Sequence, residues 1–372
     1  MKKRILVTGG AGFIGSHLTD ELLKHGYSVR VLDLLLPQVH GQGNQWPDYL
    51  NPEAELYLGD MRDPSAVEGA LKGIDAVFHL AAAVGVGQSM YEIAHYTSVN
   101  NGGTAILLEC LAKRPVERVI VASSMSIYGE GLYQNKAGKL VDVTERTMEQ
   151  LRARRWELCD LDGSELTPVP TPETKPPALS SVYALSKYDQ ERMCLIFGKS
   201  YNIPTVALRF FNVYGTRQSL SNPYTGVLAI FASRLLNNQP PLINEDGNQK
   251  RDFVSVLDVA AAGRLALESP QADGHAINIG SGVAVSVLEL AQLLGEMLER
   301  KHVGCDVTFR YRKGDIRHCF ANVGQAKRLL GYQPKMSLEA GMIDLVEWLE
   351  GQTATDHVHR AQEELLARGL AI

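Results

Sequence analysis

The sequence is poor in cysteine. Its 372 residues contain five cysteines, an odd number scattered along the chain: Cys110, Cys159, Cys194, Cys305 and Cys319. Disulfide frameworks and structural zinc sites need several cysteines or histidines at close, paired spacing. We therefore expect no disulfide and no bound metal, and a reducing cytoplasm as the compartment.

Long apolar runs and basic clusters are also missing. No stretch reaches the length of about 20 apolar residues that a membrane helix needs, and the residues after Met1 lead into a short apolar strand without a secretory signal. The net charge is −5, whereas nucleic-acid binding needs clustered lysine and arginine. We expect a soluble protein that binds neither membranes nor nucleic acids.

Short β-rich runs alternate with helical patterns through the first part of the chain. The expected strands are residues 4–8, 28–32, 55–58, 76–80, 118–122 and 205–210, and the expected long helices are 100–113 and 181–201. Such alternation is typical of a parallel sheet with helices on both faces. The sequence therefore predicts an α/β fold with a doubly wound Rossmann sheet and a smaller mixed α/β lobe after it.

A glycine-rich turn follows the first expected strand. Gly9, Gly12 and Gly15 lie three residues apart where a helix begins, so a pyrophosphate can approach the N–H groups of the helix N-terminus. A tight strand-to-helix turn is the alternative, but strand, turn and helix together favour a dinucleotide site. Its other candidate residues are Phe13 and Ile14 in the turn, and Asp60, Met61, Leu80, Ala81 and Ala82 at the carboxyl ends of later strands.

Asp33 ends the second expected strand, 18 positions beyond Gly15. A carboxylate there accepts hydrogen bonds from both ribose hydroxyls of adenosine and repels a 2′-phosphate, which favours NAD over NADP. An ordinary strand-end carboxylate is the alternative.

Tyr183 and Lys187 lie four residues apart on an expected helix and so share one face. The ammonium group favours the phenolate and lowers the tyrosine pKa. A solvated helix face is the alternative, but hydroxyl groups follow the fifth strand at the same sheet edge. Of these we choose Ser124 to hold a substrate oxygen, with Ser126 as second choice.

The chain resembles the extended short-chain dehydrogenases/reductases, a family that includes NAD-dependent nucleotide-sugar epimerases and dehydratases. The resemblance covers about residues 3–350 and rests on motifs in a fixed order: TGGAGFIG (8–15), GDMRD (59–63), HLAA (79–82), NNGGT (100–104), SSMSIYG (123–129), YALSK (183–187), RFFNVYG (209–215) and RDFV (251–254). It implies that Ser124, Tyr183 and Lys187 are catalytic and that Tyr183, Lys187 and Asn100 contact NAD. It also implies a homodimer formed through the two long helices.

The same resemblance implies which residues bind a nucleotide sugar. Asn212, Arg251, Arg312 and Asp315 fall where family members contact the diphosphate and ribose. The guanidinium fork matches phosphate oxygens, although isolated arginines are more often surface charges. Gln88 and Ser89 either face the sugar or cap the next helix. Some relatives carry two Cys-x-x-Cys pairs in the region where this chain keeps only Cys159, which argues against zinc.

From these patterns we divide the chain into three parts. Residues 1–211 form the NAD-binding domain, with a flap inserted at about 131–177, where hydrophobic periodicity is lost and prolines gather. Residues 212–350 form mainly the substrate lobe, part of which is expected to return to the Rossmann sheet. Residues 351–372 form a helical extension that packs on the body or on a partner.

The resemblance narrows to epimerases of dTDP-L-rhamnose or UDP-hexoses through residues 81–93 and 123–131. It implies inversion at C4 of a UDP- or dTDP-hexose through a transient 4-keto sugar. A 4,6-dehydratase needs acidic residues after the catalytic serine, where this chain has Met125 and Ser126. A 4-keto reductase or a non-catalytic NAD sensor would also fit these motifs.

Overall fold

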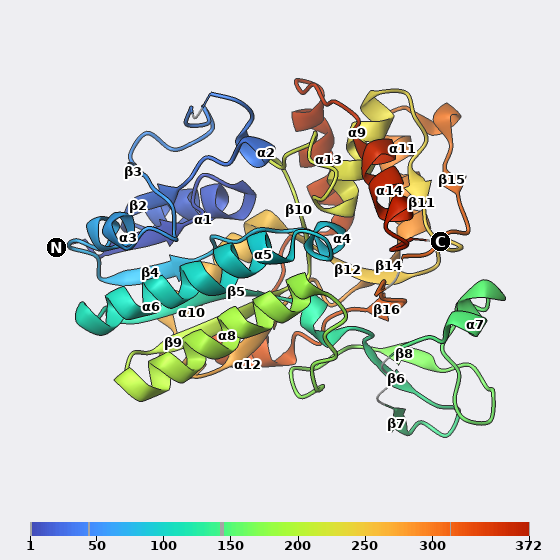
Figure 1. Ribbon diagram of the computed structural model, residues 1–372, viewed down its shortest axis with the longest axis horizontal. Helices are drawn as coiled ribbons and strands as arrows, with labels where there is room; N and C mark the ends of the chain where they lie inside the picture. The colour runs from blue at the N-terminus through green and yellow to red at the C-terminus, as the bar shows by residue number, and fades with distance from the viewer. Residues whose placement is uncertain (1, 44, 142–144, 313, 372) are drawn as a thin grey trace.

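Seven parallel strands form the central sheet (Figure 1), in the order β13-β9-β5-β4-β1-β2-β3. The computed structural model describes residues 2–43, 45–141, 145–312 and 314–371. The strands are β1 (Arg4–Thr8), β2 (Ser28–Asp33), β3 (Glu55–Leu58), β4 (Ala76–His79), β5 (Arg118–Ser124), β9 (Thr205–Phe210) and β13 (Ala276–Ile279). The strand order reverses between the neighbouring strands β1 and β4. Ligands of doubly wound sheets bind at the carboxyl ends of the strands beside such a reversal.

Helices cover both faces of this sheet. Because successive side chains of a strand point to opposite faces, Ile5 and Val7 pack against α1 (Phe13–Lys24) and α10 (Val256–Glu268), whereas Leu6 belongs to the core on the other face. That second core is closed by α3 (Pro64–Ala70), α6 (Gly103–Lys113) and α8 (Val182–Tyr201). The predicted Rossmann fold is confirmed.

The two long helices have well-defined ends. The Ser181 side chain accepts a hydrogen bond from the Ala184 N–H and caps α8, which ends at Asn202 in the left-handed conformation (φ 55°). The helix expected at 100–113 begins earlier, because a π-helix (Thr97–Gly102) runs directly into α6.

A smaller sheet follows residue 212 and is built around β12 (Lys250–Ser255). This strand pairs with β10 (Asn212–Tyr214), β14 (Ala284–Ser286) and β16 (His318–Cys319). The other elements of this part are β11 (Leu242–Ile243), β15 (Asp306–Val307), α9 (Val227–Leu236), α11 (Val287–Met297), α12 (Gly324–Leu330), α13 (Leu338–Leu349), α14 (Val358–Ala367) and the 3-10 turns Pro270–Ala272 and Lys301–Val303.

The segment expected to be a flap contains a three-stranded antiparallel sheet (Figure 1), made of β6 (Leu132–Gln134), β7 (Leu140–Val141) and β8 (Thr167–Val169), and the short α7 (Met148–Arg152). Ion pairs tie it to the rest of the chain. Arg317 is fully buried and lies 2.9 Å from Glu245 and 2.6 Å from Asp246, and it also pairs with Glu157 of the flap segment. Charged contacts of this kind leave no hydrophobic period in the sequence.

The remaining short elements are α2 (Pro37–His40), α4 (Val86–Ser89), α5 (Ile93–Tyr96) and the 3-10 turn Met125–Tyr128. All five cysteines carry free thiols. None of the helices within the described residues is long and apolar enough to cross a membrane.

Candidate active site

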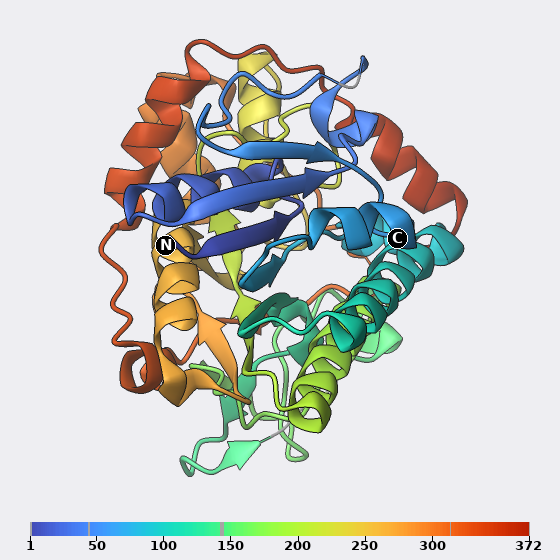
Figure 2. The same cartoon turned by 90° about the vertical axis from the view of Figure 1, so that its left-hand side faces the viewer.

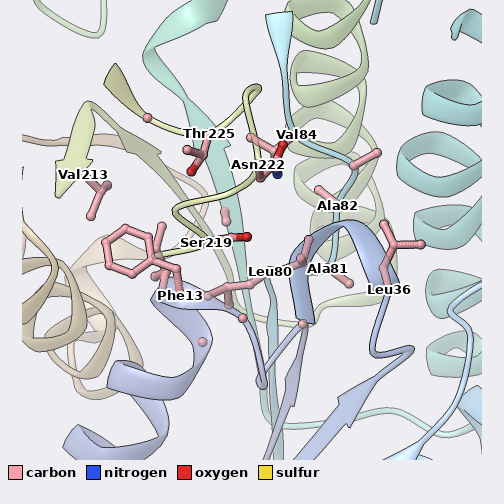
Figure 3. Close-up of a pocket in the computed structure, with 18 of the residues that line it drawn as sticks. Phe13, Leu36, Leu80, Ala81, Ala82, Val84, Val213, Ser219, Asn222 and Thr225 are labelled. Atoms are coloured by element: carbon pink, nitrogen blue, oxygen red, sulfur yellow. The ribbon is translucent and has the colours of Figure 1, made fainter. Parts of the chain in front are cut away.

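A cavity of about 460 Å³ lies along the carboxyl edge of the large sheet. In Figure 3, Phe13 and the residues after β4 line one side of it, while Val213, Ser219, Asn222 and Thr225 approach from the later part of the chain. All but one of the predicted cofactor residues line this cavity: Gly9, Gly12, Phe13, Ile14, Gly15, Asp33, Asp60, Met61, Leu80, Ala81, Ala82, Tyr183 and Lys187. The exception is Asn100.

The glycine turn requires residues without side chains. A Cβ atom at Gly15 would lie 2.3 Å from the Gly9 carbonyl oxygen, and Gly9 itself has a φ of +69°. The chain therefore turns sharply from β1 into α1, so the N-terminal N–H groups of α1 stand beside the cavity, where they attract anions.

Asp33 is held rigidly at the end of β2. Its two carboxylate oxygens accept hydrogen bonds from the Ala11 N–H (3.0 Å) and the Leu35 N–H (2.9 Å). His40 Nε2 lies 3.7 Å away, and burial lowers the pKa of this imidazole although Asp33 opposes the shift. A neutral His40 leaves the Asp33 charge available to ribose hydroxyls. Sequence reasoning missed His40, because it ends the short helix α2, which carries no motif.

Asn100 lies behind the cavity wall and does not line it. Its side chain is fully buried, accepts a hydrogen bond from the Ala83 N–H (2.7 Å), and donates to the Ala83 carbonyl (3.1 Å) and the Ser186 hydroxyl (2.9 Å). It joins the loop after β4 to α8. Asn100 is therefore a positioning residue. The cofactor contact expected of it is not seen, because its side chain does not line the cavity.

Ser124, Tyr183 and Lys187 all line the first cavity. Ser124 ends β5, and its hydroxyl accepts a hydrogen bond from the Ser126 hydroxyl at 2.9 Å. Tyr183 lies in the first turn of α8, where its N–H donates to the Ser89 hydroxyl (3.0 Å), and Lys187 lies one turn later. Burial raises the pKa of Tyr183, and a hydrogen bond with Ser124 opposes that shift.

A buried polar network supports Lys187 from behind. Its ammonium group donates to Gln190 Oε1 at 2.6 Å, and Gln190 Nε2 donates to the Thr104 hydroxyl at 2.9 Å. His79 joins this network through Thr104 and Thr8, and burial lowers its pKa to about 3, so the ring is neutral. Burial also lowers the pKa of Lys187 to about 8. Sequence reasoning missed Gln190, which carries no motif, and gave no role to His79, the first residue of the HLAA motif.

The Lys187 ammonium should make the unfolding free energy depend on pH. Its pKa falls from 10.5 to about 8 on folding, so between these pH values the unfolded chain binds more protons and the stability contributed by this group rises with pH. We expect the unfolding free energy of the wild type, relative to Lys187→Met, to increase between about pH 8 and pH 10. Urea unfolding of both proteins across this range measures the difference, and a difference independent of pH would contradict the assignment.

A second cavity, of about 400 Å³, adjoins the first and shares Ser124 and Tyr183 with it. The predicted substrate residues Ser126, Asn212, Arg251, Arg312 and Asp315 line it, and so does Arg310, which sequence reasoning missed.

Some polar groups of this cavity are fixed by hydrogen bonds, and others have no partner in the part of the chain that the structure describes. Arg251 donates to the Arg317 carbonyl (2.9 Å), which fixes its guanidinium, and Arg312 Nε lies 3.0 Å from Asp315 Oδ2. The side-chain oxygens of Asn212 and Gln249 are buried and find no hydrogen-bond partner among the described residues. Buried polar atoms are rarely left unpaired, so these oxygens fit a ligand that donates hydrogen bonds.

Gln88 and Ser89 line neither of these cavities. Both are buried in α4. Gln88 bonds with Gln38 and Glu92, and Ser89 holds the Tyr183 N–H. The two residues thus support the site from outside. They do not face the sugar cavity, which was one of the two expectations.

No group of three or more potential ligands suited to a metal ion occurs within the described ranges.

Comparison with known proteins agrees with this geometry. The profile of the "NAD dependent epimerase/dehydratase family" matches residues 5–153 and 161–280. The chain is 36% identical over 355 residues to a dTDP-L-rhamnose 4-epimerase of Burkholderia thailandensis, covering 93% of this chain and 95% of the relative. It is 32% identical to a putative UDP-glucose 4-epimerase of Methanocaldococcus jannaschii, covering 94% and 100%.

Solved structures show the same similarity. The Thermotoga maritima UDP-glucose 4-epimerase with UDP-glucose superposes with a TM-score of 0.75 at 33% identity, covering 93% of this chain and 98% of the other. The Thermus thermophilus UDP-glucose 4-epimerase in complex with NAD gives a TM-score of 0.72 at 30% identity, covering 94% and 100%.

Proposed function

Because the chain belongs to the NAD-dependent epimerase/dehydratase family, we propose that it is an NAD-dependent epimerase that inverts C4 of a UDP- or dTDP-hexose. One observation carries the proposal. Ser124 and Tyr183 line both cavities, so they stand between a dinucleotide site and a site rich in arginine. A sugar linked to a nucleotide diphosphate reaches Tyr183 from the second cavity when its phosphates meet the arginines.

The first cavity fits NAD. The glycine turn admits the pyrophosphate at the N-terminus of α1, and the fixed Asp33 carboxylate suits the two hydroxyls of an adenosine ribose. When bound, NAD⁺ supplies an acceptor that takes hydride from the sugar carbon and later returns it.

Tyr183 is the proposed base. Its phenolate removes the proton of the C4 hydroxyl while Ser124 holds the same oxygen, and once the C4 hydride has passed to the acceptor a ketone remains at C4. Burial alone raises the pKa of Tyr183, so the phenolate depends on a nearby positive charge, which Lys187 on the same helix face provides. After the ketone turns over in the cavity, C4 takes the hydride back on its opposite face, Tyr183 returns the proton to the oxygen, and C4 is inverted.

Elimination of water would need a further acid and base beside the sugar. Met125 and Ser126 follow Ser124, and neither carries a carboxyl group. Among the described residues, the carboxylates that line the second cavity are Glu245 and Asp315, and both already pair with arginines. The site therefore favours epimerisation over dehydration.

The activity can be tested without adding cofactor. We expect the denatured protein to release NAD, and the native protein to interconvert C4 epimers within a panel of UDP- and dTDP-hexoses. Epimerisation that consumes no external reductant supports the proposal. Stoichiometric use of added NADH would instead indicate a reductase, and bound NAD without turnover would indicate a sensor.

We also infer a homodimer that forms through α6 and α8. Leu185, Ile196 and Tyr201 of α8 are large apolar residues that are exposed in the single chain, as expected of a surface that a second copy covers. Light scattering of the purified protein tests the oligomeric state. The cytoplasmic location and the division of the chain into three parts remain predictions.

A further inference from the structure

The helix α14 forms one wall of the second cavity. Its residues Val358, Ala361, Gln362, Leu365 and Leu366 line that cavity together with Ser124 and Tyr183. The spacing of these residues places them on one helix face, so the apolar stripe of α14 faces the cavity. In Figure 2, the segment after α13 crosses the top of the molecule and α14 comes down on the other side.

Specific contacts fix α14 beside the catalytic end of the cavity. Glu364 accepts hydrogen bonds from the hydroxyls of Tyr91 (3.0 Å) and Tyr224 (3.1 Å), and the Arg368 guanidinium lies 4.2 Å from the centre of the Tyr91 ring. A Cβ atom at Gly87 would lie 3.3 Å from Leu365, so Leu365 packs closely on α4. Because α4 also holds the Tyr183 N–H through Ser89, Leu365 and the backbone of Tyr183 contact the same short helix.

The two ends of the extension are anchored to the substrate lobe. The buried Arg234 lies 2.8 Å from Asp356, just before α14. After the helix, Ala371 forms an isolated β-bridge with Arg312, one of the arginines of the second cavity. The extension thus lines the second cavity and ends at one of its arginines.

We propose that α14 completes the sugar subsite, an inference that rests on the proposed function. Ala361 and Leu365 form an apolar surface along which the 4-keto sugar turns over without leaving the cavity. Gln362, the one amide among the cavity-facing residues of α14, makes a hydrogen bond that distinguishes one hexose from another.

The chemistry of this wall matches the reaction. A ketone that must present first one face and then the other to the hydride donor cannot be held by many directional hydrogen bonds, and an apolar wall encloses it without fixing its orientation. The α14 residues that line the cavity carry no positive charge, and the arginines of the cavity are assigned to the diphosphate. The wall therefore also disfavours a hexuronate, because a buried carboxylate is costly without a partner of opposite charge. We therefore expect neutral hexoses as substrates.

Three variants test the wall. Deleting residues 358–372 removes it while keeping Asp356 for Arg234, Leu365→Ala shortens its apolar surface, and Gln362→Leu removes its hydrogen bond. Glu363→Ala is the matched control, because Glu363 is exposed on the same helix and lines neither cavity.

The measurements are KM, kcat, the affinity of the NAD-loaded protein for UDP- or dTDP-hexose by calorimetry, and the 4-keto sugar released per epimerisation. Released ketone leaves one equivalent of reduced nicotinamide on the protein, which its near-ultraviolet absorbance reports. We expect the deletion and Leu365→Ala to raise KM and ketone release by about tenfold or more, and Gln362→Leu to change the KM ratio between hexoses by about tenfold. Glu363→Ala should match the wild type.

Wild-type KM, affinity and ketone release in the deletion variant would overturn the proposal. If that variant does not fold, the two point variants decide by the same measurements. If the wild type epimerises no hexose, the proposed function fails, and the calorimetric affinities alone then test the α14 wall. A weaker affinity for nucleotide hexose in the variants would support the wall, and an unchanged affinity would reject it.

Discussion

Tyr183→Phe should retain bound NAD and lose epimerase activity by roughly 10²–10⁴-fold, the range expected when a general acid and base is removed. The substitution deletes one hydroxyl and keeps the ring. The N–H bond to Ser89 is a backbone contact and remains. Turnover of the best nucleotide hexose, together with the NAD released on denaturation, measures both parts of the expectation.

Tyr188→Phe is the matched control, since Tyr188 lies on the same helix and lines neither cavity. It should keep wild-type turnover. Substantial activity in Tyr183→Phe would show that another group carries the proton, whereas loss of NAD from this variant would show that the tyrosine serves binding more than chemistry.

Glu191→Gln should destabilise the fold by about 3–5 kcal/mol, the usual cost of removing one partner from a buried ion pair. Glu191 is fully buried, and its carboxylate lies 2.6 Å from Arg209 Nη2 and accepts from Arg209 Nε (2.9 Å) and the Ser123 hydroxyl (2.7 Å). The substitution leaves the guanidinium buried without a countercharge. Denaturant unfolding gives the free-energy difference.

Glu117→Gln provides the comparison, because Glu117 pairs with Lys3 on the surface, where both side chains are more than half exposed. Exposed pairs contribute at most about 1 kcal/mol. Equal effects of the two substitutions would mean that solvent reaches Arg209. Since Ser123 directly precedes Ser124, the Glu191 variant should also lower turnover at a temperature where it remains folded.

Most of the Rossmann sheet was predictable, because strands buried on both faces appear as short apolar runs. The predicted bounds of the buried strands β1 and β9 agree with the structure, and so do those of the largely exposed edge strand β3. The π-helix before α6 was not predictable, since one altered turn hardly changes the spacing of apolar residues. The sheet of the ion-paired flap was not predictable for a related reason, because its charged residues give no hydrophobic periodicity.

The candidate site divides in the same way. The glycine turn and the Tyr183–Lys187 pair are local patterns, and the structure brings both to one cavity. Arg310 acquires its place only when distant segments pack together. Gln190 lies three residues after Lys187 on the same helix, and only its bond to Thr104 depends on such packing. Gln88, Ser89 and Asn100 show the converse, since each belongs to a recognisable segment yet lies behind the cavity wall.

The core beneath the first cavity is shared between distant parts of the chain. Ile5 and Val7 of β1 pack in one cluster with Val259 of α10 and Ile277 of β13. A designer who wished to transplant the dinucleotide half into another protein would therefore have to carry these later residues with it. Residues 1–211 alone would lose α10 and β13 and expose part of one side of their sheet, so the fold resists modular exchange at that boundary.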